Sequence, residues 1–325
     1  MQLHIRRDAF RLKQTFTISR GSRDVAEVLA VCLTDGEHSG WGECYPYARY
    51  GESLDSVSEQ IRSVEAELVS GLDRADLRQR LPAGAARNAI DCALWDLEAK
   101  RTGTPVWQLA GLDAPEKITT AFTLSLDSPE AMRSSAAANA SRPLLKIKLG
   151  SAGDLDRLRA IREGAPDTTL IVDANEGWSA TDYDELAPIM LALGVSMVEQ
   201  PLPQSDDAEL AGRARPLTVC ADESCHDVAS LDELQDKYDM INIKLDKTGG
   251  LTEALELKAA ALERGFEVMV GCMVTSSLAM APAMLVAQGA AVADLDGPLL
   301  LAEDREHPIR YTGSVMDPAP QALWG

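Results

Sequence analysis

Residues 144–150, LLKIKLG, alternate large apolar residues with a second residue type, which is typical of a β-strand. The second residue type here is lysine. Side chains two apart along a strand point to the same face, so Lys146 and Lys148 lie side by side. Neighbouring like charges on a strand repel each other, and the pair therefore needs an explanation other than the stability of the sheet.

Seven further strand-like runs surround this one, and most are followed by a helical pattern. They are TTAFTLSL (119–126), TLIVDAN (169–175), VSMVEQP (195–201), LTVCADES (217–224), MINIKLD (240–246), FEVMVGC (266–272) and AVADLDG (291–297). Eight strands alternating with helices predict a parallel sheet that closes into a TIM-type barrel. The last run leads into PLLLAEDREHPIRY, which has no clear helical period. We therefore expect an α/β fold with a (β/α)7β barrel.

The N-terminal third has a different pattern. Residues 3–18 and 26–42 alternate apolar and polar side chains on either side of RGSRD, which predicts one long antiparallel hairpin. Helical periods follow over about 54–68 and over 85–102, the second ending at Gly103. We expect an α+β capping domain over 1–113 and a barrel over 114–297. The tail, 298–325, is expected to return to the capping domain.

The composition limits the classes of partner. The chain has 325 residues, is 46% hydrophobic and carries a net charge of −20, which argues against nucleic acids and anionic membranes. Its six cysteines form no CxxC pair, and the N-terminus has no apolar signal segment. We expect a reduced, cytoplasmic protein that acts on a small molecule, and the composition leaves a homo-oligomer open.

Charged residues recur at the C-terminal ends of the predicted strands, where barrel enzymes have their active sites. A buried parallel strand normally carries apolar residues on both faces, whereas here one face repeatedly carries ions. Any one of them alone is better explained by a salt bridge or an exposed strand end. Together, at the same end of successive strands, they predict an active site. They are Lys146, Lys148, Asp173, Glu199, Asp222, Lys244, Asp294 and Asp296.

Three of these carboxylates, Asp173, Glu199 and Asp222, come from successive strands and are expected to converge. A cation is what makes such an arrangement favourable. Ligands that are all oxygen atoms select a hard ion, so Mg²⁺ is the first choice and Mn²⁺ the second. No histidine ends these strands, which disfavours zinc.

Lys148 is placed to act as a base. An amine is an effective base only when its pKa falls toward neutrality, and a neighbouring ammonium such as Lys146 and a divalent metal both lower it. Lys244 lies four strands away and is expected to face Lys148 across the barrel. A metal between two opposed bases suits removal of a proton α to a carboxylate from one face and its return to the other.

The segments LKIKLG, IVDANEGW, VEQPLP, CADES and INIKLDKTGGL resemble the enolase superfamily in its muconate-lactonising branch, over essentially the whole chain. Within that branch, ADLDGP is similar to the DxD signature of the dipeptide epimerases, as are GECYPYARYGES and LPAGAARNAIDCALWDLEA. The resemblance implies a Mg²⁺-dependent isomerase that epimerises the C-terminal residue of L-Ala-D/L-Glu dipeptides. It also implies a role in murein peptide metabolism.

The resemblance also implies roles for individual residues. Asp173, Glu199 and Asp222 would bind one Mg²⁺ per subunit, Lys148 would be the base for the (R) epimer and Lys244 the base for the (S) epimer. The implied substrate-binding residues are Thr123, Lys146, Asp294 and Asp296, with Cys272 at a position that varies between Ser and Cys.

The substrate's ends suggest further contacts. Asp294 and Asp296 suit an α-ammonium, unless they only cap a backbone turn. The capping loops carry Arg20, Arg23 and Arg49, which would favour an acidic second residue or else be solvated surface residues.

Other functions remain open on the same scaffold. An N-acylamino-acid racemase, an o-succinylbenzoate synthase or a cycloisomerase would share the metal and the lysines, but its substrate would lack the ammonium that the DxD pair suits. A non-catalytic, metal-stabilised barrel would not need two lysines beside the metal. The KTGG stretch at 247–250 is expected to be a turn into a helix rather than a phosphate-binding loop.

Overall fold

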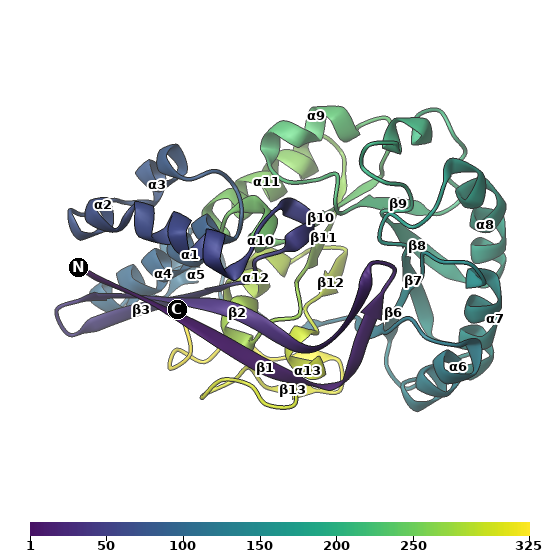
Figure 1. The fold of residues 1–325 in the computed structure, drawn as a ribbon, viewed down its shortest axis with the longest axis horizontal. Helices are drawn as coiled ribbons and strands as arrows, with labels where there is room; N and C mark the ends of the chain where they lie inside the picture. The colour runs from purple at the N-terminus through teal and green to yellow at the C-terminus, as the bar shows by residue number, and fades with distance from the viewer.

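The computed structural model describes residues 1–325, and Figure 1 shows them as two lobes. One lobe holds the N-terminal strands and helices, and the other is the barrel. Both chain ends lie in the N-terminal lobe, while the tip of the β1–β2 hairpin reaches toward the barrel strands (Figure 1). This reach brings residues near 20 to the site described below.

The N-terminal lobe is built on a three-stranded antiparallel sheet of β1 (Gln2–Ile18), β2 (Gly21–Asp35) and β3 (His38–Cys44), in that order. The expected single hairpin is therefore incomplete, because residues 26–42 span two strands. Asp35 pairs with His38, and Gly36, at φ 62°, forms the tight turn between them. An Asp-Gly pair between alternating runs is a hairpin signal that could have revealed this turn.

The long helix α4 (Ala85–Thr102) packs on this sheet and forms its core with Leu29, Val31 and Leu33 of β2. Close approach requires glycine on β3. A Cβ on Gly40 would come within 2.2 Å of the carbonyl oxygen of Ala93, and one on Gly42 within 2.1 Å of that of Ala89. The helix ends, as predicted, at Gly103, whose φ is 67°.

The other elements of this lobe are short. They are η1 (Ala48–Tyr50), α1 (Leu54–Ser63), α2 (Glu65–Val69), α3 (Arg74–Arg80) and α5 (Val106–Leu109). The helix expected over 54–68 is two helices, because Val64 leaves the helical conformation. Ser53 caps α1 through a reciprocal bond with Ser56, a device that stabilises a helix by about 1 kcal/mol.

The barrel has eight parallel strands in chain order, as predicted. They are β5 (Phe122–Leu124), β6 (Leu144–Lys148), β7 (Thr169–Asp173), β8 (Val195–Glu199), β9 (Thr218–Ala221), β10 (Met240–Ile243), β11 (Glu267–Gly271) and β12 (Val292–Asp294). Ala121 N–H donates to the carbonyl oxygen of Ala293 at 2.8 Å, beside a bridge between Thr120 and Ala293. This contact brings the last strand to the first.

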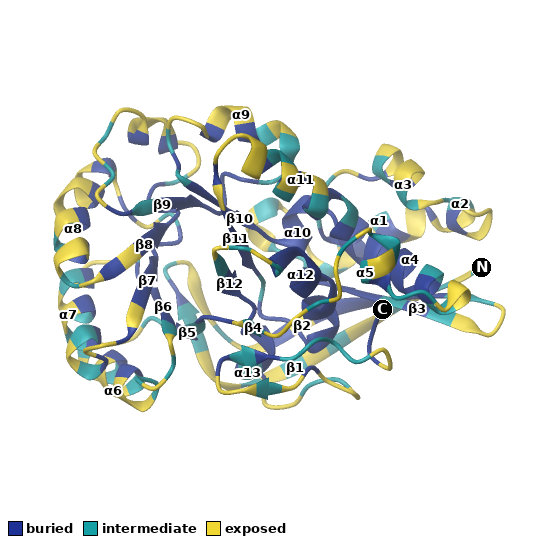
Figure 2. Ribbon diagram, turned by 180° about the vertical axis from the view of Figure 1, so that it is seen from behind, coloured by how far each residue is buried: buried dark blue, intermediate teal, exposed yellow.

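Helices cover the outside of the barrel. Most have exposed outward faces, whereas the helix over Ser277–Ala287 is buried throughout, and the strands are largely buried (Figure 2). The helical segments are α6 (Pro129–Ala138), α7 (Asp154–Gly164), α8 (Ala180–Ala192), η2 (Asp207–Leu210), η3 (Val228–Ser230), α9 (Leu231–Leu234), α10 (Leu245–Thr248), α11 (Leu251–Glu263), α12 (Ser277–Ala287) and α13 (Gly297–Leu300). Only the four-residue α13 follows β12, so the barrel has the predicted (β/α)7β form. No helix is both long and apolar enough to cross a membrane.

The tail after α13 runs back along both lobes. Its strands β13 (Tyr311–Thr312) and β14 (Val315–Met316) form a small sheet with β4 (Ile118–Thr119). At the C-terminus, the indole N–H of Trp324 donates to the carbonyl oxygen of Cys92 at 3.1 Å. The chain end is thereby attached to α4 of the first lobe.

The interior of the barrel has two layers. Near the N-terminal ends of the strands, six buried apolar side chains form a separate cluster, which we call the floor: Ala121, Ile171, Met197, Cys220, Met240 and Met269. Four of these residues are each followed, two positions later on the same strand face, by a polar residue. The polar residues are Asp173, Glu199, Asp222 and Asn242. The period of two therefore places the polar layer directly above the floor.

Candidate active site

The predicted charged residues lie together at the C-terminal ends of the strands. Lys148, Asp173, Glu199 and Asp294 are the last residues of their strands, and Asp222 and Lys244 follow theirs directly. Above them is a cavity of about 70 Å³. Ten of the thirteen predicted site residues line it: Arg20, Arg23, Thr123, Lys146, Lys148, Asp222, Lys244, Cys272, Asp294 and Asp296. Asp173 and Glu199 lie beneath, fully buried.

The lysine pair of β6 is explained by shared carboxylates. Lys148 Nζ is 2.6 Å from Asp173 Oδ2, and Lys146 Nζ is 3.2 Å from the same oxygen. Lys146 also lies 2.5 Å from Glu199 Oε2 and 2.8 Å from Asp294 Oδ2. Negative charge on three sides thus offsets the repulsion between the two ammonium groups.

The carboxylates around Lys146 keep its side chain charged. Burial lowers the pKa of Lys146, but the charges of Asp294, Glu199 and Asp173 outweigh burial and raise this pKa well above its usual value. The pKa of Lys244 is raised in the same way: burial lowers it, and Asp222 and Glu199 more than offset that effect. Sequence neighbours alone did not reveal these carboxylate contacts.

A further lysine, Lys247, belongs to the site and was missed. Its side chain is fully buried, and Nζ donates to the Asp222 carbonyl oxygen (2.5 Å), to Asp222 Oδ1 (2.7 Å) and to the Asn242 carbonyl oxygen (2.9 Å). Lys244 Nζ forms an ion pair with the other carboxylate oxygen of Asp222, Oδ2, at 2.6 Å. Lys247 lies on α10 rather than on a strand, so the strand period gave no signal. As predicted, KTGG leads into a helix, with Gly249 at φ 80°.

Five buried side-chain polar atoms in the protein have no hydrogen-bond partner, and all five are oxygens around the barrel mouth. They are Asn175 Oδ1, Glu199 Oε2, Glu223 Oε2, Asn242 Oδ1 and Asp294 Oδ1. Glu199 Oε2 is close to Lys146 Nζ, but that contact is an ion pair without hydrogen-bond geometry. Buried acceptors are almost always paired, so this concentration indicates a place where a cation or a ligand's donors bind.

The donor set fits a hard cation, since Asp173, Glu199 and Asp222 offer only carboxylate oxygens from adjacent strands. Their predicted convergence on one point is not reached in this conformation, where no three acidic, histidine or cysteine side chains are arranged to hold a metal. The physical reason is that lysines occupy the carboxylates. Asp173 forms ion pairs with Lys146 and Lys148, and Asp222 forms ion pairs with Lys244 and Lys247.

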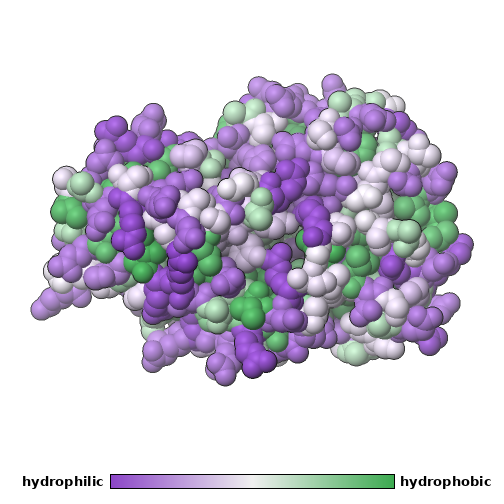
Figure 3. Space-filling model, in the orientation of Figure 1, coloured by the Kyte–Doolittle hydropathy of each residue, from purple (hydrophilic) through white to green (hydrophobic).

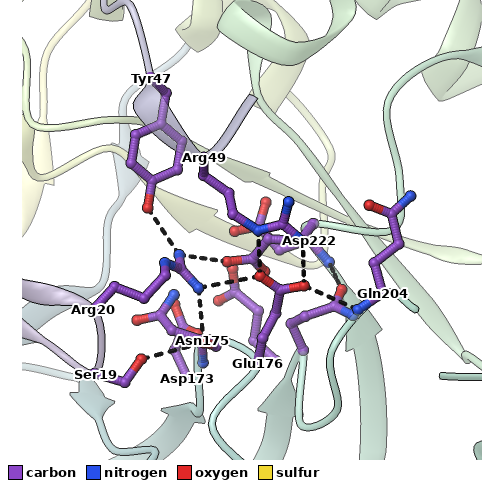
Figure 4. A network of polar contacts seen from close by, with 12 residues as sticks. Ser19, Arg20, Tyr47, Arg49, Asp173, Asn175, Glu176, Gln204 and Asp222 are labelled. Atoms are coloured by element: carbon purple, nitrogen blue, oxygen red, sulfur yellow. Dashed lines mark hydrogen bonds and ion pairs between the residues drawn. The ribbon is translucent and has the colours of Figure 1, made fainter. Parts of the chain in front are cut away.

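Two capping-loop arginines are engaged with carboxylates of the barrel (Figure 4). Arg20 contacts Glu223 at 2.7 Å and donates to the Asn175 carbonyl oxygen at 2.7 Å. Arg49 forms a bidentate pair with Glu176, both contacts being 2.7 Å. Glu176 and Glu223 were not singled out from the sequence, because each follows a predicted ligand in a loop.

Arg23 differs from the other two arginines. It lines the cavity, has no carboxylate partner, and lies over the ring of Tyr45 at 5.3 Å. Burial lowers the pKa of Arg23, and the nearby charge of Arg20 acts in the same direction. Arg23 is therefore the capping-loop cation that is left available for an anionic group.

The two aspartates of the DxD segment have partners that their sequence neighbours did not suggest. Lys146 contacts Asp294 Oδ2, and Thr123 N–H donates to Asp296 Oδ2 at 2.6 Å. One oxygen of Asp296 therefore does bind a backbone N–H, as in the alternative that these aspartates only cap a turn. Burial and the charge of Asp294 raise the pKa of Asp296 to about 7. Burial and the same two aspartates raise the pKa of the Cys272 thiol, which keeps it protonated.

Family comparisons agree with this architecture. The family described as "Mandelate racemase / muconate lactonizing enzyme, N-terminal domain" matches residues 1–111, and "Enolase C-terminal domain-like" matches residues 131–314. The L-Ala-D/L-Glu epimerase of Escherichia coli is 48% identical over 307 residues, covering 94% of this chain and 96% of the relative. An N-acetyl-D-glutamate racemase of a Pseudoalteromonas species is 45% identical over 92% of this chain and 95% of its own.

Two crystal structures superimpose on almost the whole chain. An enolase family member from Agrobacterium tumefaciens with homology to dipeptide epimerases, containing sodium and L-Ala-L-Glu, has a TM-score of 0.98, 51% identity and 99% coverage of both chains. A dipeptide epimerase from Enterococcus faecalis, complexed with Mg and L-Leu-L-Tyr, has a TM-score of 0.92 and 29% identity, covering 100% of this chain and 99% of its own. The chain therefore belongs to the mandelate racemase and muconate lactonizing enzyme family of the enolase superfamily.

Proposed function

We propose that the protein is a Mg²⁺-dependent dipeptide epimerase that inverts the α-carbon of the C-terminal residue of L-Ala-L-Glu and L-Ala-D-Glu. The observation that carries the proposal is the group of five buried oxygens without a hydrogen-bond partner. Three of them, on Asn175, Glu223 and Asp294, belong to residues that line the same cavity as Lys148 and Lys244. The named relatives and their bound dipeptides support it. A cytoplasmic location and a role in murein peptide turnover are part of the proposal.

Asp173, Glu199 and Asp222 would hold Mg²⁺, which supplies positive charge for the substrate carboxylate next to the reacting carbon. The chain's own groups then divide the proton chemistry. Lys148 ends β6 and Lys244 follows β10, four strands away, so the two amines approach the α-carbon from different sides. One takes the proton from one epimer, and the other delivers a proton to the opposite face. Lys146 stays an ammonium among its carboxylates and stabilises the negative charge that develops.

The rest of the cavity suits the two ends of a dipeptide that are not reacting. Asp294 Oδ1 is buried and unpartnered, which makes it the acceptor for the substrate α-ammonium. Arg23, which has no carboxylate partner, is the group for an acidic second side chain. The outer face is largely hydrophilic (Figure 3), and a chain at −20 gains from each cation that reaches its interior carboxylates.

A second candidate is racemisation of an N-acylated amino acid such as N-acetylglutamate. The N-acetyl-D-glutamate racemase relative favours it, and so do the contacts within the DxD segment. Lys146 and the Thr123 N–H already satisfy one oxygen of each aspartate, which reduces the need for a substrate ammonium. The two candidates share the metal and both lysines and differ only at this end of the substrate.

Free and acetylated substrates should separate the candidates. A charged hydrogen bond contributes roughly 1.5–3 kcal/mol, so we expect kcat/KM for N-acetyl-L-Ala-L-Glu to be about 10- to 150-fold below that for L-Ala-L-Glu. Asp296→Asn keeps an acceptor for the Thr123 N–H and removes the negative charge beside Asp294, the assigned acceptor. It should therefore narrow this gap by slowing only the free dipeptide. The measurement is deuterium incorporation at the α-carbon in D₂O. Equal rates for both substrates, or faster exchange of N-acetylglutamate, would favour the racemase instead.

Arg23 should determine the preference for an acidic second residue. Arg23→Leu removes the available guanidinium, and we expect kcat/KM for L-Ala-L-Glu to fall at least about tenfold because a charge-assisted pair is lost. The rate for L-Ala-L-Leu, which has no side-chain charge, should change little. Arg6→Leu is the matched control, since Arg6 also lies over an aromatic ring, Trp41, at 5.4 Å but is outside the cavity. Equal losses on both dipeptides would contradict the assignment.

A further inference from the structure

Gln200 immediately follows Glu199 at the end of β8, and its backbone is unusual. Its φ is +34°, a region that residues other than glycine seldom adopt, and the residue is fully buried. Conformations of this kind persist where the surroundings hold them in place, and they concentrate at functional sites. Gln200 belongs to the segment VEQPLP, whose pattern predicted no role for it.

The side-chain amide of Gln200 connects β8 to the end of β9. Its Oε1 accepts from the Asp222 N–H at 2.9 Å and from the Ser224 N–H at 3.1 Å. Its Nε2 is 3.0 Å from the Leu202 carbonyl oxygen, 2.8 Å from Ser224 Oγ and 2.9 Å from the Tyr238 hydroxyl. The main chain of Asp222 is thereby fixed to the residue after Glu199.

The surrounding groups also fix which way the amide points. The hydroxyls of Ser224 and Tyr238 donate to Asp207 Oδ2, at 2.6 and 3.0 Å. Because their hydrogens are used there, they accept from Gln200 Nε2, and the two backbone N–H groups require its oxygen. A carboxylate of the same shape would place an oxygen against three acceptors. The position is therefore specific for an amide.

The main chain of Gln200 also contacts the loop after β7 and strand β9. The Glu176 N–H donates to the Gln200 carbonyl oxygen at 2.9 Å, and the Gln200 N–H donates to the Cys220 carbonyl oxygen at 2.8 Å. One residue thus links the strand ends that carry Asp173, Glu199 and Asp222. Groups behind metal ligands commonly set metal affinity in this way.

We propose that Gln200 is a positioning residue that fixes the relative placement of the main-chain segments bearing Asp173, Glu199 and Asp222 before a metal binds, an inference that rests on the metal site of the proposed function. It touches neither substrate nor reacting atoms. Its contribution is to hold the main chain of Asp222 and Glu199, so that only the side chains of the ligands have to exchange their lysine partners for the cation.

The test is direct Mg²⁺ binding by titration calorimetry to the purified full-length protein without substrate. We expect Gln200→Glu to weaken binding at least about tenfold. The added negative charge would by itself strengthen binding, so a loss reports on geometry. Gln200→Asn, which keeps an amide but shortens its reach, should weaken binding in the same direction.

Tyr238→Phe is the control in the same network. After this change Nε2 retains Leu202 and Ser224 as acceptors for its two hydrogens, and the bonds to Asp222 are untouched. Thermal unfolding should show a loss of stability, while Mg²⁺ affinity stays within about threefold of the wild-type value. This separates a positioning role from general destabilisation.

Three outcomes would overturn the inference. They are Mg²⁺ affinities of both Gln200 variants within threefold of wild type, a parallel loss of affinity in Tyr238→Phe, and failure of both Gln200 variants to fold, which would assign the residue to the fold alone. If the wild-type protein itself binds no Mg²⁺, the metal site of the proposed function fails first, so the two failures are distinguishable.

Discussion

Lys148→Ala and Lys244→Ala should each abolish net interconversion of L-Ala-L-Glu and L-Ala-D-Glu. Each variant removes the amine on one side of the α-carbon, and general acid–base catalysis contributes about 10²- to 10⁴-fold. Epimerisation needs an amine on both sides of the α-carbon, whereas exchange of the α-proton with solvent needs an amine on only one side. We therefore expect each variant to retain deuterium exchange for the epimer whose base survives, measured by NMR in D₂O.

Lys258→Ala is the matched control for these variants. Lys258 is a partly buried lysine on α11 that donates to the carbonyl oxygens of Val286 and Gln288, outside the cavity. Its loss should affect stability and leave both exchange rates near the wild-type values. Net epimerisation near the wild-type rate in either Lys148→Ala or Lys244→Ala would show that the assignment of two bases is wrong.

Metal removal should have a comparable effect. EDTA is expected to abolish turnover and added Mg²⁺ to restore it, because the substrate carboxylate otherwise meets only Asp173, Glu199 and Asp222. Asp222→Asn removes one ligand charge and also leaves Lys244 and Lys247 without their carboxylate. Breaking a buried pair costs about 3–5 kcal/mol, so turnover and stability should both fall, turnover by orders of magnitude.

A stability control separates the two effects of Asp222→Asn. Asp91 on α4 is buried and accepts from the N–H and hydroxyl of Thr252, away from the cavity. Asp91→Asn should lower the unfolding temperature while keeping the Mg²⁺ dependence of the rate. Full activity of the wild-type enzyme in a metal-free sample would contradict the metal requirement.

The strand period was sufficient to predict the barrel and the inward direction of its charged residues. It works because every second side chain of a strand shares a face, so Ile171 and Asp173 had to point the same way. The two-residue period predicts nothing about residues that lie outside the strands. Lys247, Glu176 and Gln200 lie in a short helix or in loops, and each acts through contacts that no fixed spacing describes.

The partners of charged residues were equally hard to predict. Asp294 pairs with Lys146, which is 148 positions away in the sequence, and Arg49 pairs with Glu176 across the two lobes. Three capping-loop arginines looked alike in the sequence. Only the folded chain shows that two of them are already neutralised and that Arg23 is not.

The apolar floor makes the barrel a cup rather than a tube. Three of its six side chains, Ile171, Met197 and Cys220, lie two residues before Asp173, Glu199 and Asp222, so a change in the floor alters the chemistry above it. The rim is different, because Arg20 and Arg23 lie at the tip of the β1–β2 hairpin and Arg49 lies in η1, all in the other lobe, which can vary while the barrel strands stay the same. Substitutions in the two places, whether they arise in evolution or by design, should therefore affect different properties of the protein. Changes in the barrel interior should alter proton transfer, and changes at the rim should alter which substrates bind.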